Sequence, residues 1–385
     1  MEIVIISYFF PPCATGAATV MYNLCKHLPK RSFYTVTARS ELAIHLGIYD
    51  REYALDCRTI RLPVSTSSML ARFKFFLLAV LTGFSLYKKE RIDCIFVVYP
   101  YFTDLLAGYV LHKLTGKPLV IYMHDLFSEV RKNARAYKMW VFLESKILSS
   151  AETVLVMNDK YIKHYSRRGI DNLTIFPPSI DLSEVECFEP SGASKDKSGG
   201  KLKIVFTGSV YTAHEDAVVA LLEAAKMLEG IQVLFATPRN KGLTNHAEYL
   251  LKEVNIGFLP KKKCMELQRT ADVLFLPLSA NSPYPEEVEV AFPCKLLEYL
   301  AAGRPVLAVV PEGSFVESFI REHDVGIAVT GVSTEKITEA IEELKDEEKR
   351  KRYGRNALKV VKFFDAKKQS KHLLSIFESI VSRHK

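Results

Sequence analysis

The first half of the chain alternates short apolar runs with longer segments of helical length. The apolar runs are bounded by polar or turn-forming residues, which is typical of buried strands. The expected strands are residues 3–7, 94–98, 119–123 and 153–157, and the expected helices lie near 17–29, 69–88, 103–115 and 136–150. Strands that alternate with helices predict a parallel sheet covered on both faces.

This pattern stops between residues 176 and 200, where Pro, Ser, Gly and charged residues replace the apolar periodicity. Such a composition is typical of a linker. The pattern then resumes with expected strands at 203–207, 231–236, 273–276 and 306–310 and expected helices near 215–229, 262–270, 294–302 and 333–344. A second α/β domain is therefore predicted.

We predict two Rossmann-like domains that face each other across a cleft. The expected bounds are residues 1–180 for the first domain, 181–199 for the linker and 200–360 for the second domain, with a helix at about 365–385 packing back on the first domain. A chain of 385 residues suits two domains of ~150–200 residues better than one core. Open α/β sheets bind ligands beyond the carboxyl ends of their strands, so the active site is expected in the cleft.

The seven cysteines form no C-x-x-C pair, and most lie in apolar runs. Neither a disulfide framework nor a zinc site is predicted. The N-terminus carries the apolar run 3–6 without the basic segment and cleavage site of a signal peptide, so a cytoplasmic protein is expected.

Charge is unevenly distributed along the chain. Residues 1–180 hold 23 Lys and Arg against 14 Asp and Glu, whereas the remaining residues hold 29 against 30. This asymmetry indicates a polyanionic partner for the first half, either an anionic membrane surface or nucleic acid; a solvated basic face is the alternative. Nucleic-acid binding explains none of the loops described below, and we do not predict it.

The segment 69–88 contains an apolar run, Phe75–Leu86, together with Arg72, Lys74 and Lys88. The run is shorter than the ~20 residues that span a bilayer. It suits an interfacial helix that docks on an anionic membrane, on the acceptor side of the protein. The alternative is a buried helix of the first domain.

Two loops of the first half are candidate binding loops. The loop after strand 3–7 places Gly16 and Ala17 at a helix start, where backbone N–H groups favour ligand oxygens. His124 and Asp125 follow strand 119–123, where a histidine can bind a hydroxyl or a forming oxyanion. In the structural alternatives, Gly16 serves only the turn, His124 satisfies loop backbone and Asp125 caps a helix.

The second half opens in a similar way, with Gly208 and Ser209 between a strand and a helix. Backbone N–H groups of such a loop can receive a diphosphate. The loop contains no Lys or Arg, and His214 is its one side chain that can become cationic. The sequence therefore predicts phosphate binding through the backbone.

The most informative segment is VAFPCKLLEYLAAGRPVLAVV, residues 290–310. Pro293 lies at a predicted helix start, Lys295 and Glu298 share one helix face, and Gly303 closes the helix. A carboxylate on such a helix suits a ribose diol, while the helix N-terminus suits phosphate. The alternative is a surface Lys–Glu pair of little energetic value.

Together these segments resemble glycosyltransferase family 4, the retaining sugar-nucleotide transferases of GT-B fold. The motifs that carry the resemblance are YFFPP with Gly16, HDLFSE, FTGS, ADVLFLPLS and PCKLLEYLAAGRPVLA. The resemblance implies that Gly16 with Ala17 approaches the donor phosphate and sugar, that His124 reaches the reaction centre, and that Glu298 binds the nucleotide ribose.

Two departures from the family pattern stand out. Val290 occupies the position of the first Glu of E-x7-E, although Glu287 and Glu289 lie just upstream. The basic pair expected on the diphosphate is missing, and Arg239, Lys241 and Lys295 are the candidate substitutes. The expected donor-binding residues are Gly16, Ala17, Gly208, Ser209, Arg239, Pro293, Cys294, Lys295, Leu296 and Glu298, with His124 and Asp125 catalytic.

The resemblance implies a retaining transfer of a sugar from a UDP- or GDP-sugar to a hydroxyl of a glycan or lipid-linked acceptor, by front-side displacement and without a protein nucleophile. No D-x-D-type motif is evident, so we expect no cofactor and no essential metal. The protein is expected in the cytoplasm, peripheral on the inner face of the cell membrane. The alternatives are a catalytically silent sugar-nucleotide-binding or assembly subunit and a sugar-nucleotide epimerase on the same scaffold.

Overall fold

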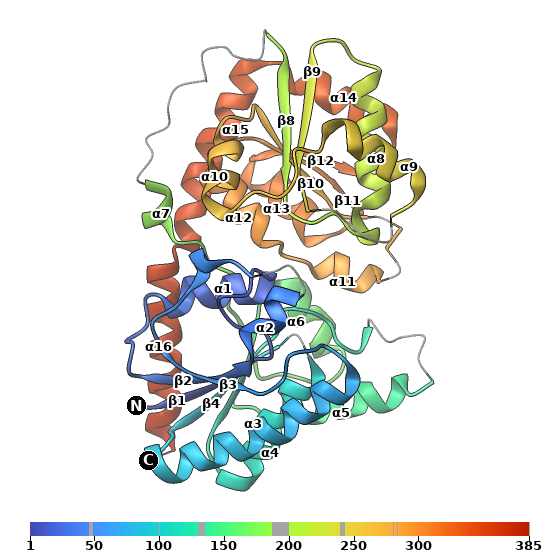
Figure 1. Cartoon of the computed structure of the whole chain (residues 1–385). Helices are drawn as coiled ribbons and strands as arrows, with labels where there is room; N and C mark the ends of the chain where they lie inside the picture. The colour runs from blue at the N-terminus through green and yellow to red at the C-terminus, as the bar shows by residue number, and fades with distance from the viewer. Residues whose placement is uncertain are drawn as a thin grey trace. The chain divides into compact units, whose positions relative to one another are not determined.

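The computed structural model describes residues 1–45, 49–99, 101–129, 135–186, 200–238, 243–279, 281–282 and 284–384. The chain forms two compact units, each with its own parallel sheet (Figure 1). The first unit comprises Met1–Ile180 and Ala366–Lys385, and the second comprises Asp181–Asp365. The predicted α/β fold with two Rossmann-like sheets is confirmed.

Seven strands in the described part of the first unit form a sheet in the order β3-β2-β1-β4-β5-β6-β7, and every neighbouring pair is parallel. The strands are β1 (Ile3–Ile6), β2 (Phe33–Ala38), β3 (Arg58–Leu62), β4 (Cys94–Val98), β5 (Leu119–Tyr122), β6 (Thr153–Val156) and β7 (Leu173–Ile175). The chain reverses its direction of travel across the sheet between β1 and β4. The loops after these two strands therefore flank the topological switch point, where α/β sheets bind ligands.

Helices cover both faces of the first sheet. They are α1 (Gly16–Cys25), α2 (Ser40–His45), α3 (Met69–Glu90), α4 (Phe102–Thr115), α5 (Tyr137–Ser149), α6 (Asp159–Ser166) and α16 (Ala366–Arg383), with the short 3-10 turn η1 (Arg51–Tyr53). The Phe96 ring lies 5.2 Å from that of Phe377 in α16, while Val97 lies against Gly108 of α4. Because successive strand residues point to opposite faces, α4 and α16 cover opposite sides of the sheet.

The C-terminal helix α16 is an integral part of the first unit. Leu373 and Phe377 are buried, and the Ser370 hydroxyl donates to the Leu24 carbonyl of α1 at 2.8 Å. The Ala366 N–H donates to the Ile180 carbonyl at 2.9 Å. The first unit is thus built from the two ends of the chain.

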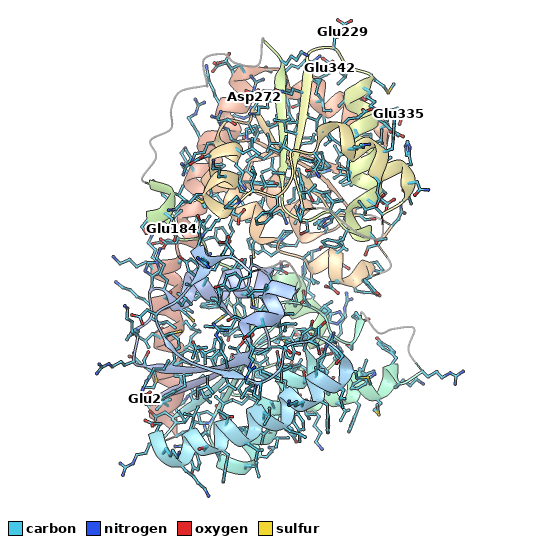
Figure 2. All side chains as sticks on the ribbon, in the orientation of Figure 1. Glu2, Glu184, Glu229, Asp272, Glu335 and Glu342 are labelled. Carbon is cyan, nitrogen blue, oxygen red and sulfur yellow. The ribbon has the colours of Figure 1, made fainter. Side chains whose placement is uncertain are left out.

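Five strands in the described part of the second unit form a parallel sheet in the order β12-β11-β10-β8-β9. They are β8 (Leu202–Thr207), β9 (Ile231–Ala236), β10 (Val273–Pro277), β11 (Val306–Val310) and β12 (Gly326–Thr330). The switch point lies between β8 and β10. Figure 2 shows Asp272, Glu229 and Glu342 at the end of this sheet where β8 and β10 begin, opposite to the carboxyl ends of the strands.

The second sheet is also covered on both faces. Its helices are α7 (Leu182–Glu186), α8 (Glu215–Lys226), α9 (Asn245–Val254), α10 (Lys261–Arg269), α11 (Pro285–Val290), α12 (Cys294–Ala301), α13 (Phe315–His323), α14 (Thr334–Leu344) and α15 (Glu347–Val360), with 3-10 turns η3 (Thr212–His214) and η4 (Val361–Phe364). α8 and α14 pack together over one face, where Phe206, Phe235 and Phe275 join the core. α12 packs against β10, β11 and α15.

The segment predicted as a linker contains the short helix α7, which contacts the second unit. The Glu184 carboxylate (labelled in Figure 2) lies 2.7 Å from the Lys261 ammonium, and Arg269 donates to the Val185 carbonyl at 3.1 Å. Residues 182–186 of the predicted linker therefore form a helix that is attached to the rest of the second unit by an ion pair and a hydrogen bond.

Candidate functional site

The turn after β8 requires glycine at position 208. Gly208 has φ +114°, a backbone conformation that L side chains rarely adopt. A Cβ at this position would also collide with the Lys295 side chain, whose Nζ would lie 2.6 Å away. The turn thus lets a cationic side chain approach the backbone at the carboxyl end of β8.

Lys295 comes from the first turn of α12. The helix begins after Pro293, which has extended backbone angles, and Cys294 and Lys295 are its first two residues. The Lys295 Nζ lies 5.7 Å from the centre of the Phe206 ring. Among the residues that the structure describes, no side chain forms an ion pair or hydrogen bond with this ammonium. An ammonium beside a helix N-terminus and a glycine turn suits an anion.

Glu298 does not pair with Lys295 within the described residues; it belongs to a different network. Its Oε2 accepts a hydrogen bond from Gln268 Nε2 at 3.2 Å. The same Gln268 nitrogen donates to Thr207 Oγ1 at 2.8 Å, and the Thr207 N–H donates to the Tyr299 hydroxyl at 3.3 Å. The structure therefore does not contain the surface ion pair between Lys295 and Glu298 that was the alternative interpretation of this segment.

Gln268 is a member of this network that sequence reasoning missed. Its side chain is buried at the carboxyl half of α10, and its amide joins the end of β8 to α12. Because a buried amide needs partners, Gln268 fixes the position of the Glu298 carboxylate. The sequence feature that could have pointed to this residue is its position: Gln268 is a polar residue just before the motif ADVLFLPLS.

His214 lies beside the same turn. Burial and, to a smaller extent, the charge of Lys295 lower the pKa of His214 to about 3, although a backbone hydrogen bond with Ser209 opposes the shift. His214 is therefore neutral near pH 7 and brings no positive charge to this turn. Ser209 itself is exposed.

The loops after β8 and β10 are tied together by Asp216 in the first turn of α8. Its Oδ2 accepts hydrogen bonds from Ser279 Oγ at 2.7 Å and from Asn281 Nδ2 at 3.1 Å. These are the two loops of the switch point. The contacts connect the start of α8 to the loop after β10.

Three further donor-side residues have definite places. Leu296 is fully buried and packs α12 into the second unit. Val290, at the position of the expected carboxylate, is the last residue of α11 and is buried. Glu289 is exposed, and Arg239 and Lys241 lie outside the described residues.

In the first unit, His124 lies just beyond the carboxyl end of β5. Its side chain is buried, its ring lies 4.2 Å from that of Tyr122, and its carbonyl accepts a hydrogen bond from the Tyr161 hydroxyl at 2.8 Å. Burial lowers the pKa of His124 to about 3. Its Nε2 has no hydrogen-bond partner among the described residues. A neutral imidazole with an unused nitrogen can bind a ligand hydroxyl. Asp125 beside it is partly exposed.

The switch point of the first sheet is held by a buried carboxyl group. Asp104, in the first turn of α4, accepts a hydrogen bond from the Tyr8 N–H at 3.0 Å. Burial raises the pKa of Asp104 to about 8, although that hydrogen bond, Thr103 and Arg72 oppose the shift. A neutral Asp104 thus connects the loop after β1 to the helix after β4.

Gly16 and Ala17 open α1, and Thr15 caps the helix by accepting from the Ala18 N–H at 3.3 Å. A Cβ on Gly16 would meet nothing within 4 Å. Packing within the described protein therefore does not require glycine here, and the space above the helix start is open.

The three residues expected on the acceptor or membrane side differ from one another. Arg72 lies 4.0 Å from the centre of the Tyr101 ring and donates to the Ser67 carbonyl at 2.9 Å. Lys74 and Lys88 are exposed on α3. Arg72 is thus held against its own unit, whereas the two lysines face solvent.

No group of three or more His, Cys, Asp or Glu side chains suited to a metal ion occurs in the described part of the chain. The six described cysteines, Cys13, Cys25, Cys57, Cys94, Cys264 and Cys294, have free thiols.

Solved structures with the same fold cover almost the whole chain. A sucrose-phosphate synthase from Thermosynechococcus elongatus is 16% identical with a TM-score of 0.73, and the match covers 99% of each chain. The Anabaena protein HepE in complex with UDP-glucose is 13% identical with a TM-score of 0.72, covering 98% of this chain and 100% of that one. A glycosyltransferase from Rickettsia africae is 14% identical with a TM-score of 0.70, covering 99% and 98%. These neighbours establish the GT-B fold.

No curated protein matches the chain in sequence. Two family models do. The model "Glycosyltransferase Family 4" matches residues 14–184, and the model "Glycosyl transferases group 1" matches residues 192–360. Since the two models between them match nearly the whole chain, the protein belongs to glycosyltransferase family 4.

Proposed function

We propose that this glycosyltransferase moves a sugar from a UDP- or GDP-sugar to an acceptor hydroxyl with retention of configuration. The observation that carries the proposal is the group formed by Gly208, Lys295 and Glu298 at the carboxyl end of β8. It offers a cation and a helix N-terminus for a diphosphate, and a fixed carboxylate for a ribose diol. The complex of the Anabaena neighbour with UDP-glucose supports a nucleotide-sugar donor.

In the proposed reaction the bond between the anomeric carbon and the donor phosphate oxygen breaks. The acceptor oxygen forms its bond to that carbon on the same face, and the acceptor proton passes to the departing diphosphate. Lys295 and the N-terminus of α12 balance the negative charge that grows on the leaving group. The neutral His124 binds a sugar hydroxyl and orients the donor sugar.

We propose that no metal ion is essential, because Lys295 and helix N-termini supply the positive potential that a divalent cation would otherwise provide. The measurement is transfer with and without EDTA. A steep loss of activity in EDTA that manganese or magnesium restores would contradict this part of the proposal.

For the acceptor we propose a lipid-linked or cell-envelope glycan, reached from the cytoplasmic side of the membrane. The free thiols of the described cysteines support a reducing compartment. The first unit carries 28 Lys and Arg against 15 Asp and Glu, a formal charge of +13, which supports an anionic environment.

The deciding experiment incubates the protein with a panel of nucleotide sugars and membrane extract. We expect one donor to be hydrolysed slowly alone and transferred when extract is present. Binding of a donor without any turnover would favour the silent subunit, an alternative to which the buried Val290 gives some support. The anomeric configuration of the product, measured by NMR, tests retention.

A further inference from the structure

The outward face of α3 is apolar, contrary to what a surface helix normally presents. Met69, Leu70, Phe73, Leu77 and Leu81 are all exposed, and the exposed fractions of Met69 and Leu81 are 86% and 66%. They recur along one side of the helix over about 18 Å, at 1.5 Å per residue. A helix of a soluble domain ordinarily turns polar residues to water.

The opposite face of α3 is already used for packing. Phe75 and Ala79 are fully buried, and a Cβ on Gly83 would lie 2.5 Å from Leu111 Cδ2 of α4. The helix is long and apolar enough to cross a membrane by length and composition, yet only 22% of its most apolar window is buried. Because the packed side fixes α3 to its sheet, the exposed side suits a surface rather than a crossing segment.

The two helices that follow α3 in the first unit also expose apolar side chains. α4 packs against both α3 and α5, and the three helices lie together in the first unit (Figure 1). On α5, Met139 and Phe142 are exposed, the latter by 64%. On α4, Leu114 is exposed. We call the exposed side chains of α3, α4 and α5 the docking face.

The charge of the docking face is almost entirely positive. The exposed lysines of these three helices are Lys74, Lys88, Lys89, Lys113, Lys138 and Lys146. Of the acidic residues in the same helices, Asp104 and Glu144 are buried and only Glu90 is exposed. Glu144 is also paired with Arg168 at 2.8 Å, so it presents no charge to the surface. The face therefore complements an anionic surface.

We propose that the docking face binds the surface of an anionic lipid bilayer, with the apolar side chains inserted at the level of the headgroups. Aliphatic and aromatic groups beside scattered lysines are the composition of interfacial helices, and the lysines are attracted to the negative surface of an anionic bilayer. Nucleic acid would use the charges and leave the five aliphatic and aromatic residues of α3 in water. Membrane binding itself does not depend on the proposed function. Only the suggestion that docking brings a lipid-linked acceptor within reach rests on it.

The test is co-sedimentation of the full chain with vesicles of phosphatidylcholine alone and of phosphatidylcholine mixed with phosphatidylglycerol. We expect sedimentation with the anionic vesicles only, weakened by added salt. The triple variant Phe73→Ser, Leu77→Ser, Leu81→Ser should reduce binding by about tenfold or more, because three apolar side chains lose their burial. The matched control Met227→Ser, Phe258→Ser changes exposed apolar residues of the second unit and should bind as the parent does.

Equal sedimentation with both vesicles, or unchanged binding by the triple variant, would overturn the proposal. So would light scattering that shows the parent to be a dimer and the triple variant a monomer, with neither bound to vesicles, because a second copy would then cover the face. Slow donor hydrolysis in solution is measured on the same samples. A parent protein that hydrolyses a donor but does not bind the anionic vesicles counts against docking alone. A parent protein that binds the vesicles but hydrolyses no donor counts against the transferase.

Discussion

The carboxyl ends of the two sheets use polar groups in opposite ways. In the first unit the key groups are buried and neutral: burial lowers the pKa of His124 to about 3 and raises that of Asp104 to about 8. In the second unit the side chains of Lys295 and Glu298 are partly exposed, and that of Lys295 lies against the turn at Gly208. We propose that the neutral His124 meets a sugar hydroxyl, whereas Lys295 and Glu298 meet the nucleotide diphosphate and ribose. The buried Asp104 holds the loop after β1 in place.

The largest effect is expected at Lys295, at the carboxyl end of the second sheet. Lys295→Met keeps an unbranched side chain of nearly the same length and removes the ammonium, so we expect transfer to fall by about 10²–10³-fold, the scale of one lost electrostatic contact to a developing anion. Lys295→Arg is the conservative control and should retain much of the activity. A small effect of Lys295→Met on kcat/KM would show that the diphosphate is balanced elsewhere.

The next largest effect is expected at His124, at the carboxyl end of the first sheet. His124→Ala should lower transfer by about 10²-fold through loss of an orienting hydrogen bond. Since the imidazole is neutral above about pH 3, the activity of the parent should show no step that depends on His124 between pH 5 and 8. A step near pH 6.5 that disappears in His124→Gln would contradict the neutral assignment.

The ribose contact depends on both Glu298 and its buried neighbour. Glu298→Ala should weaken nucleotide-sugar affinity by ~1–3 kcal/mol. Gln268→Ala leaves the carboxylate in place without its support, so we expect a smaller loss of the same kind, and a double-mutant cycle should show that the two effects are not additive. Calorimetric titration measures both. Unchanged affinity in a folded Glu298→Ala protein would remove the ribose assignment.

The smallest effect concerns stability and the charge of Asp104. A carboxyl group whose pKa is raised on folding contributes stability below its unfolded pKa and loses it as pH rises toward about 8. Asp104→Asn keeps an acceptor for the Tyr8 N–H and removes this titration. Relative to the parent, its free energy of unfolding should therefore improve with pH, by about 1 kcal/mol per unit between pH 5 and 7. Urea unfolding at several pH values measures it, and parallel pH profiles would show that Asp104 is ionised in the folded protein.

The elements that the sequence predicted are those with continuous apolar runs. β8 was expected at 203–207 and β11 at 306–310, and both occur there because strands buried on both faces leave few polar residues. β2 (FYTVTA) and β3 (RTIRL) escaped prediction. Polar residues interrupt the apolar runs of both strands, and some of them are accommodated only across the sheet: Arg58 of the edge strand β3 lies 3.8 Å from the centre of the Tyr34 ring of β2. Such pairs cannot be read from periodicity.

The same limit applies to the candidate site. Gly208, Lys295 and Glu298 lie in motifs whose turn and helix signals are local, so their grouping at the carboxyl end of β8 could be expected. Gln268 reaches Thr207 across 61 residues of sequence, and Asp104 reaches Tyr8 across 96. The burial that gives these two residues their roles exists only after the sheets have assembled.

The place of α16 has a consequence for synthesis of the protein on the ribosome. The core of the first unit includes Phe377 against Phe96 and Ser370 against α1, so it stays incomplete until α16 emerges. The second unit, Asp181–Asp365, is contiguous and can complete its own core earlier. Residues 1–180 therefore remain partly folded until α16 is synthesised. During that interval their apolar surfaces can bind chaperones or aggregate.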